Sequence, residues 1–273
     1  MQLNDEQDVL KWYRSGERTL NKAFLDEIPW GEVKKYPLDP SFIPVLVYMR
    51  DVERYTEVYY KELKGTPTVK DTVIKSFMDQ WEDEEVLHAD LLHRFLGEMD
   101  YPTDEKWYEK VRQQIPKSYH MISKLQTLIT NGFGKHFTSV HMTWGAINEM
   151  STMAGYQRLW KLAKHPILEQ ILRGIVQEEG KHSFFYWNIA RLKLNQSKFR
   201  QDLTRFIVKH FWSPVGEGTK SKADSNYVIR ALFGDPEGIS VMDKIVNQRM
   251  EQLPGMAGLK AVTERISQVA SLA

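Results

Sequence analysis

The stretch that decides the fold is WEDEEVLH, residues 81–88, which contains the pattern Glu85-x-x-His88. The same pattern returns 94 residues later as Glu179-x-x-His182, and no other Glu-x-x-His occurs in the chain. On a helix, residues three apart lie one above the other on the same face, so each pair can hold one metal ion. Two copies of the motif therefore predict a single site shared by two helices.

Each motif helix is preceded by a predicted helix with one inward-facing glutamate. Glu53 follows Leu46 and Met49 on an apolar face, and Glu57 is the reserve candidate. Glu149 is the only acidic residue of its predicted helix and falls on a largely apolar stripe. The lone glutamate precedes the motif glutamate by 32 residues in the first half and by 30 in the second. This spacing predicts a pseudo-repeat of two helical hairpins.

The sequence predicts an all-α fold without strands. A four-helix bundle with Glu-x-x-His on two helices and a lone Glu on each of the other two builds a carboxylate-bridged di-iron or di-manganese centre. We therefore predict one ferritin-like domain over residues 1–273, with a bundle core at about 41–194, a helical crossover within it and a helical extension at 195–273. The expected helices before the extension are at about 5–25, 41–64, 68–97, 102–116, 117–130, 135–163 and 166–194.

Three local signals mark the expected helix ends. Ser41 can cap the second helix, and Thr68 with Asp71 three residues on resembles a capping box for the third. His165-Pro166 separates the last two helices of the core, with the proline at the first helical position.

Composition excludes several classes of protein. The chain has no cysteine, which excludes disulfides, thiolate zinc sites and iron–sulfur clusters, so electrons would have to come from another protein. The net charge is +1, so no overall field recruits nucleic acid or an anionic membrane, and an anionic partner would need a local patch. The acidic N-terminus is unlike a signal peptide and no apolar run is long enough to span a bilayer. We expect a soluble, cytoplasmic protein.

The donor set indicates which metals the site would take. Carboxylate and imidazole without thiolate suit iron or manganese, including a mixed pair, and the ligand types alone leave zinc open. Four carboxylates balance the charge of two ferrous ions, so metal binding would remove a repulsion inside the bundle.

These residues resemble the soluble acyl-acyl-carrier-protein desaturases, a branch of the ferritin-like di-iron carboxylate proteins. The resemblance covers roughly residues 30–186. Its strongest motifs are VLV at 45–47, EE-x-x-H at 84–88, Glu149-x-x-Thr152 and EE-x-x-H-x-x-x-Y at 178–186. It implies two iron ions, with Glu85 and Glu179 as the bridges. The implied ligands are Glu53, Glu85, His88, Glu149, Glu179 and His182.

The resemblance also assigns roles around the ligands. Thr152 matches a threonine beside the oxygen-binding face, where a hydroxyl can donate protons, although a helix threonine bonding to the i−4 carbonyl is the alternative. Trp30 matches a tryptophan on the presumed electron route, and Tyr186 matches a tyrosine four residues after the second histidine. Metal-bound histidines pass their second N–H to a carboxylate. From the pseudo-repeat we expect Glu178 beside His88 and Glu84 beside His182.

The reaction implied by the family is an O₂-dependent desaturation that places a cis double bond in an acyl chain. The family's partners are acyl carrier protein and a ferredoxin-like electron donor, and its members are homodimers. The segment 191–209 is rich in basic residues and is the candidate docking surface for the acidic carrier. Gly145 and Ala146, with Met142 and Met153 nearby, are expected either to line an apolar tunnel or to allow close helix packing.

Two other functions share the same ligands. A di-iron oxygenase that hydroxylates carbon or oxidises an amine is the first alternative, and an iron-binding ferritin-like protein is the second. A ribonucleotide-reductase radical subunit is disfavoured, because it carries a tyrosine four residues after the first-motif histidine and this chain has Leu92 there.

Overall fold

The computed structural model describes residues 3–104 and 106–271. Within these residues the structure is helical and contains no β-strand, only one isolated bridge between Glu217 and Lys220. The all-α prediction is confirmed. No helix of the part described is both long enough and apolar enough to cross a membrane.

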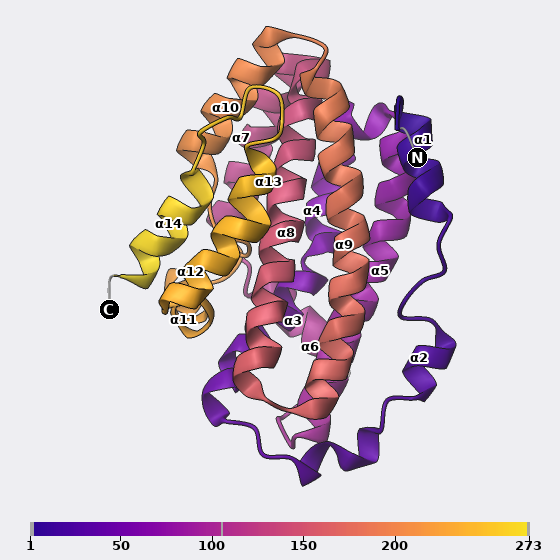
Figure 1. The fold of residues 1–273 in the computed structure, drawn as a ribbon, viewed down its shortest axis with the longest axis vertical. Helices are drawn as coiled ribbons and strands as arrows, with labels where there is room; N and C mark the ends of the chain where they lie inside the picture. The colour runs from indigo at the N-terminus through magenta and orange to yellow at the C-terminus, as the bar shows by residue number, and fades with distance from the viewer. Residues whose placement is uncertain (1–2, 105, 272–273) are drawn as a thin grey trace.

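Long helices lie side by side in the centre of the molecule (Figure 1). They are α3 (Ile43–Arg54), continued by α4 (Thr56–Leu63), then α5 (Thr72–Glu98), α8 (Thr138–Ala163) and α9 (Pro166–Leu194). The connection between α8 and α9 is short because Lys164 adopts a left-handed conformation, at φ 51°. His165 then caps α9 by accepting from the backbone N–H of Leu168. The break predicted at His165-Pro166 is confirmed.

Contacts at the helix ends show the direction of each helix. Thr68, just before α5, bonds to His141 near the start of α8, at 2.6 Å. Lys193, at the end of α9, pairs with Asp71 at the start of α5, at 3.0 Å. The helices α5 and α8 therefore begin at the same end of the bundle, and α9 ends there.

A crossover allows α8 to begin at the same end as α5. It consists of α6 (Trp107–Gln113), α7 (Lys117–Phe133) and the 3₁₀ turn η4 (Gly134–Phe137). The predicted turn at 131–134 begins only at Gly134, whose φ of 57° favours glycine.

The structure corrects three local predictions. Residues 5–25 form two helices, α1 (Glu6–Arg14) and α2 (Lys22–Asp26), because the segment between them lies over the bundle and bonds to it. Asp39 rather than Ser41 caps the short 3₁₀ helix η2 (Pro40–Phe42) before α3. Asp71 alone caps α5, while the side chain of Thr68 bonds elsewhere, so the capping box is wrong.

The C-terminal third covers one side of the bundle. Its elements are α10 (Lys198–Phe211), α11 (Lys222–Phe233), α12 (Pro236–Met242), the π-helical turn η5 (Asp243–Asn247), α13 (Gln248–Met250) and α14 (Ala261–Ala270). Helix α11 packs against both α3 and α8. On the other side, α1 packs on α9 and α5, and the 3₁₀ helix η1 (Trp30–Lys35) packs on α5. One continuous apolar core includes residues from Val9 to Ile266.

Candidate metal centre

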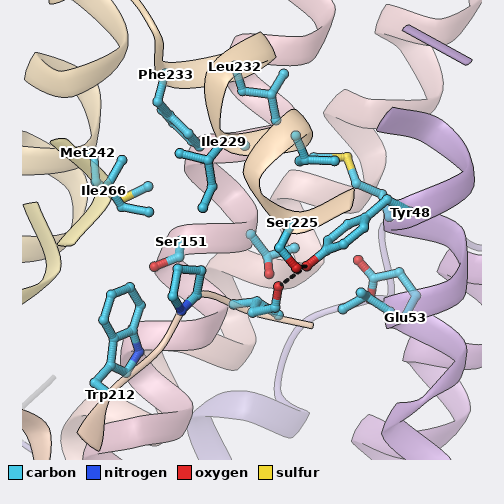
Figure 2. Close-up of a pocket in the computed structure, with 17 residues that line it drawn as sticks. Tyr48, Glu53, Ser151, Trp212, Ser225, Ile229, Leu232, Phe233, Met242 and Ile266 are labelled. Atoms are coloured by element: carbon cyan, nitrogen blue, oxygen red, sulfur yellow. Dashed lines mark hydrogen bonds between the residues drawn. The ribbon is translucent and has the colours of Figure 1, made fainter. Parts of the chain in front are cut away.

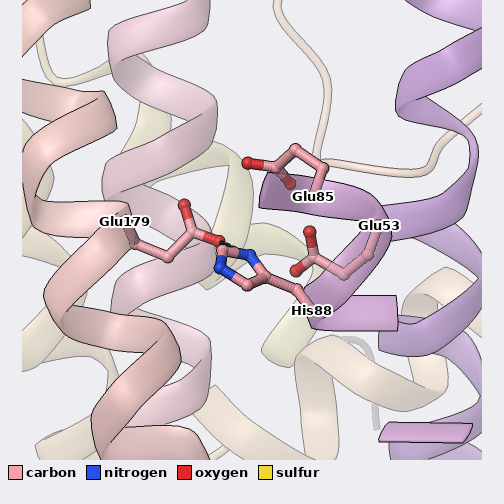
Figure 3. Close-up of side chains that lie close together, drawn as sticks. All are labelled: Glu53, Glu85, His88 and Glu179. Atoms are coloured by element: carbon pink, nitrogen blue, oxygen red, sulfur yellow. Dashed lines mark ion pairs between the residues drawn. The ribbon is translucent and has the colours of Figure 1, made fainter. Parts of the chain in front are cut away.

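Six side chains from four helices converge in the middle of the bundle. They form two groups in which the possible ligand atoms lie within 4.8 Å of one another. The first group is Glu53, Glu85, His88 and Glu179, and Figure 3 shows them pointing toward one another from α3, α5 and α9. The second group is Glu85, Glu149, Glu179 and His182. The two groups share Glu85 and Glu179, the residues expected to be bridges.

Helix geometry explains this convergence. Residues at i and i+3 share a helix face, so α5 presents Glu85 and His88 together and α9 presents Glu179 and His182. The lone glutamates, Glu53 and Glu149, lie at 4% and 6% exposure, so both point inward as their apolar neighbours predict. All six predicted ligands are buried and lie together.

The two imidazoles bridge the inner cluster and an outer pair of carboxylates. His182 has its Nδ1 at 3.0 Å from Glu85 and its Nε2 at 2.7 Å from Glu84. His88 has its Nδ1 at 3.3 Å from Glu179 and its Nε2 at 3.2 Å from Glu178. Each outer glutamate therefore supports the histidine of the opposite motif, as the pseudo-repeat predicts. This contact orients each ring with Nδ1 toward the cluster.

The N-terminal segment completes this outer layer, which sequence patterns did not reveal. Tyr13 donates to Glu84 at 2.6 Å, and the backbone N–H of Leu20 donates to Glu178 at 3.1 Å. The Arg18 guanidinium lies 3.4 Å from Glu84 and 3.6 Å from Glu178. These contacts come from the end of α1 and the segment that follows it, which carry no recognisable motif, so only their position in the fold reveals them.

Two aromatic residues hold the lone glutamates. Tyr156 on α8 donates a hydrogen bond to Glu53, and the indole N–H of Trp81 on α5 donates to Glu149 at 3.1 Å. Tyr156 follows Glu149 by seven residues on the same stripe, which is the one sequence signal that could have suggested it.

The pKa values of the carboxylates in this cluster shift in opposite directions. Burial and the charges of Glu179, Glu53 and Glu149 raise the pKa of Glu85 well above its usual range. Burial, with the charge of Glu179, does the same to the pKa of Glu149. Burial also opposes ionisation of Glu179, but the close approach of both imidazoles outweighs burial and lowers the pKa of Glu179.

The pKa values of both histidines are raised. Burial opposes their protonation, yet the contacts of His88 with Glu178 and Glu179 raise its pKa to about 9. The pKa of His182 is raised well above its usual range by its carboxylate neighbours, against the effect of burial.

Unpartnered atoms show that a cation fits the cluster. Glu85 Oε1, both carboxylate oxygens of Glu179, and the Nδ1 atoms of His88 and His182 are buried and have no well-directed hydrogen bond among the described residues. Buried polar atoms in folded proteins are normally satisfied. All of these atoms belong to the two groups, and carboxylate oxygens and imidazole nitrogens are ligands for iron and manganese.

Two cavities reach the cluster and meet at Glu53 and Thr152. One is lined by four of the predicted ligands, Tyr186, residues of α7 and the segment after α10. The other is almost entirely apolar, has a volume of about 70 Å³ and extends among α3, α8, α11, α12 and α14. Figure 2 shows its wall, with Glu53 on one side and Ile229, Leu232 and Phe233 on another. Its mostly apolar lining with a few polar groups is typical of a site for an apolar small molecule.

The predicted residues around the ligands have mixed outcomes. Thr152 lies one turn from Glu149, lines both cavities and makes no hydrogen bond to the i−4 carbonyl within the described chain. Tyr186 lines the first cavity and donates to the sulfur of Met78 at 3.1 Å. Trp30 lies in η1 with Arg94 over its ring at 4.1 Å. No hydrogen bond or ring contact in the described residues joins Trp30 to the ligands or to Glu178.

Of the four residues expected to line a tunnel, only Gly145 lines either cavity. Met142 and Ala146 are fully buried in the core, and Met153 lines neither cavity. Gly145 lines the first cavity and also makes room for Tyr186, since a Cβ at this glycine would lie 2.3 Å from the tyrosine ring. Gly155 on α8 and the C-terminal helices contribute the apolar lining instead.

The basic segment 191–209 does not form one free surface. Lys193 pairs with Glu6 and Asp71, and Lys198 pairs with Asp202. Arg191 donates to the carbonyl of Leu3, and Arg205 donates to those of Gly255 and Ala257. Arg200 donates to the carbonyl of Lys193 at 3.4 Å, so five of the six basic residues of this segment are engaged in contacts with neighbouring residues.

Comparison with known proteins leaves this site as the main guide to function. No protein-family model, no curated protein and no solved structure matches the chain.

Proposed function

We propose that this protein is an O₂-dependent di-iron oxidoreductase of the ferritin-like class that desaturates an acyl chain. The observation that carries the proposal is the pair of buried ligand groups sharing Glu85 and Glu179, next to an apolar cavity. The order of the helices, with a crossover between α5 and α8, also agrees with a ferritin-like bundle.

The six ligands would hold two iron ions. When bound and reduced, such a pair supplies O₂ chemistry able to remove hydrogen from an unactivated C–H bond. Glu84 and Glu178 hold the histidine rings in place, and Tyr13 and Arg18 hold those carboxylates. This outer layer keeps Nδ1 of each ring directed at the cluster.

The cavities determine which substrate fits. The lining of the apolar cavity favours an apolar group over a charged one. Thr152 lines both cavities, so its hydroxyl can donate a proton to a group that reacts beside Glu149 and Glu53. Electrons come from an external donor of the ferredoxin type, because the chain has no cysteine for an iron–sulfur cluster of its own.

The experiment is incubation of iron-loaded, reduced protein with O₂, an electron donor and a panel of acyl substrates. The panel contains acyl carrier protein thioesters, coenzyme A thioesters, free fatty acids and phospholipids. Mass spectrometry of the lipid distinguishes loss of two hydrogens, which means desaturation, from gain of one oxygen, which means hydroxylation. Glu179→Ala is the inactive control. Mineralisation of excess iron without any change in the lipids would identify a ferritin-like iron store and overturn the proposal.

A further inference from the structure

Helix α7 has its apolar side turned to solvent. Met121, Ile122, Leu125, Leu128 and Ile129 are between 45% and 70% exposed. Its polar side faces the protein instead, and Ser123 and Thr130 are the two residues of α7 that are buried. This is the reverse of the usual pattern for a surface helix in a globular protein. An apolar stripe with no partner indicates an interaction surface.

Helix α10 extends the same surface. Phe199, Phe206 and Phe211 are 52%, 54% and 59% exposed. The turn η4 contacts both helices, and the ring of His136 in η4 lies 5.3 Å from that of Phe199. Of the eleven large apolar side chains that are exposed in the described residues, nine belong to α7 and α10. The exposure is therefore concentrated on two helices rather than scattered over the surface.

The charged residues of this surface are almost all basic. Residues 110–148 contain no Asp or Glu. The cations on α7, η4 and α10 are Lys117, Lys124, Lys135, Lys198, Arg200, Arg205 and Lys209, and the only acid among them is Asp202. Arg205 keeps its charge while donating to backbone carbonyls. A basic rim around a face of large apolar residues is the composition of helices that lie in a membrane interface.

We propose that α7, η4 and α10 form a docking face for the surface of a bilayer that contains anionic lipids. The apolar side chains enter the boundary between headgroups and acyl chains, and the cations contact the headgroups. A second copy of this chain fits the face less well, because a two-fold contact would bring the same cations against one another.

The cavity that reaches the ligands opens beside this face. Its wall includes Tyr119 and Gln126 of α7 and residues 213–217 directly after α10, together with Glu53 and Glu149. A lipid chain leaving the bilayer at the docking face would therefore meet this cavity first. This second step rests on the proposed function and identifies the substrate as a membrane-derived acyl chain. The docking itself does not depend on the metal.

Vesicle co-sedimentation of the full chain, with and without iron, tests the docking. We expect at least tenfold tighter binding to vesicles of phosphatidylcholine with phosphatidylglycerol than to phosphatidylcholine alone, and weaker binding as salt rises. Leu125→Asn with Leu128→Asn should weaken binding tenfold or more, as should Lys124→Glu with Lys209→Glu. The exposed leucines are 58% and 68% accessible, so the fold should tolerate their replacement.

Matched controls lie elsewhere on the surface. Lys22→Glu reverses a charge on α2, and Tyr36→Asn removes an exposed apolar side chain outside the patch. Both should bind vesicles as the unaltered chain does. Equal binding to both kinds of vesicle, or no binding to either, overturns the proposal. So does a dimer in analytical ultracentrifugation that the Leu125 and Leu128 replacements dissociate while vesicles remain unbound. Because iron-free protein is tested too, loss of the proposed oxidoreductase activity would not be mistaken for loss of docking.

Discussion

Removal of the shared ligand Glu179 should abolish both metal sites, whereas removal of Glu149 should abolish one. Glu179 belongs to both ligand groups, and Glu149 belongs to the second alone. We therefore expect two iron ions for the unaltered chain, about one for Glu149→Ala, and almost none for Glu179→Ala. A ligand that binds only the folded state stabilises it by about 2.7 kcal/mol at a hundredfold excess over Kd.

Thermal unfolding measures the same difference as a shift in Tm. Two occupied sites at that excess stabilise the chain by about 5 kcal/mol, which raises Tm by about 10–20 °C in a chain of this size. Glu149→Ala should retain about half of this shift and Glu179→Ala none. The assay combines iron determination after gel filtration with calorimetry of the iron-free and iron-loaded forms, and circular dichroism of the iron-free variants checks that each one folds.

Glu57→Ala is the matched control. Glu57 was the reserve ligand candidate, but it pairs with Arg54 at 2.6 Å and is absent from both ligand groups. This variant should keep two iron ions and the full shift in Tm. The reasoning fails if Glu179→Ala still binds two ions, or if the single-group and shared-group variants lose the same amount of iron.

Three further predictions follow from the same geometry. Glu178→Gln should weaken metal affinity about 10–100-fold at unchanged stoichiometry, because Glu178 orients His88 without being a ligand, and full affinity in a metal titration would contradict this role. Metal affinity should rise as pH rises from 6 toward 9, because the raised pKa of Glu85 and the pKa of His88 at about 9 mean that bound protons must leave as metal enters. Calorimetry in buffers of different ionisation enthalpy measures that release, and a pH-independent affinity would refute it. Gly145→Ala should destabilise the chain by about 1–3 kcal/mol in urea unfolding, because its Cβ would overlap the ring of Tyr186. The double variant with Tyr186→Leu should recover part of that loss, and equal instability of the two variants would exclude the overlap as the cause.

The ligand set could be predicted because local rules determine it. The three-residue spacing places Glu85 with His88 and Glu179 with His182 on any helix, whatever the surrounding fold. The apolar neighbours of Glu53 and Glu149 then fix which way each lone carboxylate points. The pseudo-repeat also predicted which outer glutamate faces which histidine, since it implies that the two halves of the site are related by an approximate two-fold axis.

Other features depend on long-range packing. Arg18 and Tyr13 reach Glu84 only because the N-terminal segment folds back over α5 and α9. The apolar cavity exists because α11, α12 and α14 cover α3 and α8, and no local pattern specifies where a C-terminal extension will pack. The basic segment 191–209 illustrates the same limit, because sequence shows its charges but not their partners.

The amino-acid sequence alone determined the helical character of this chain, the positions of its longest helices and the six residues of the candidate metal centre. These depend on periodicity and on interactions within a few residues. The tertiary structure decided which side of α7 faces solvent, because an amphipathic helix can present either side to the bundle until its neighbours are in place. It also decided what surrounds the ligands, because contacts between residues more than 60 positions apart exist only after the chain has folded.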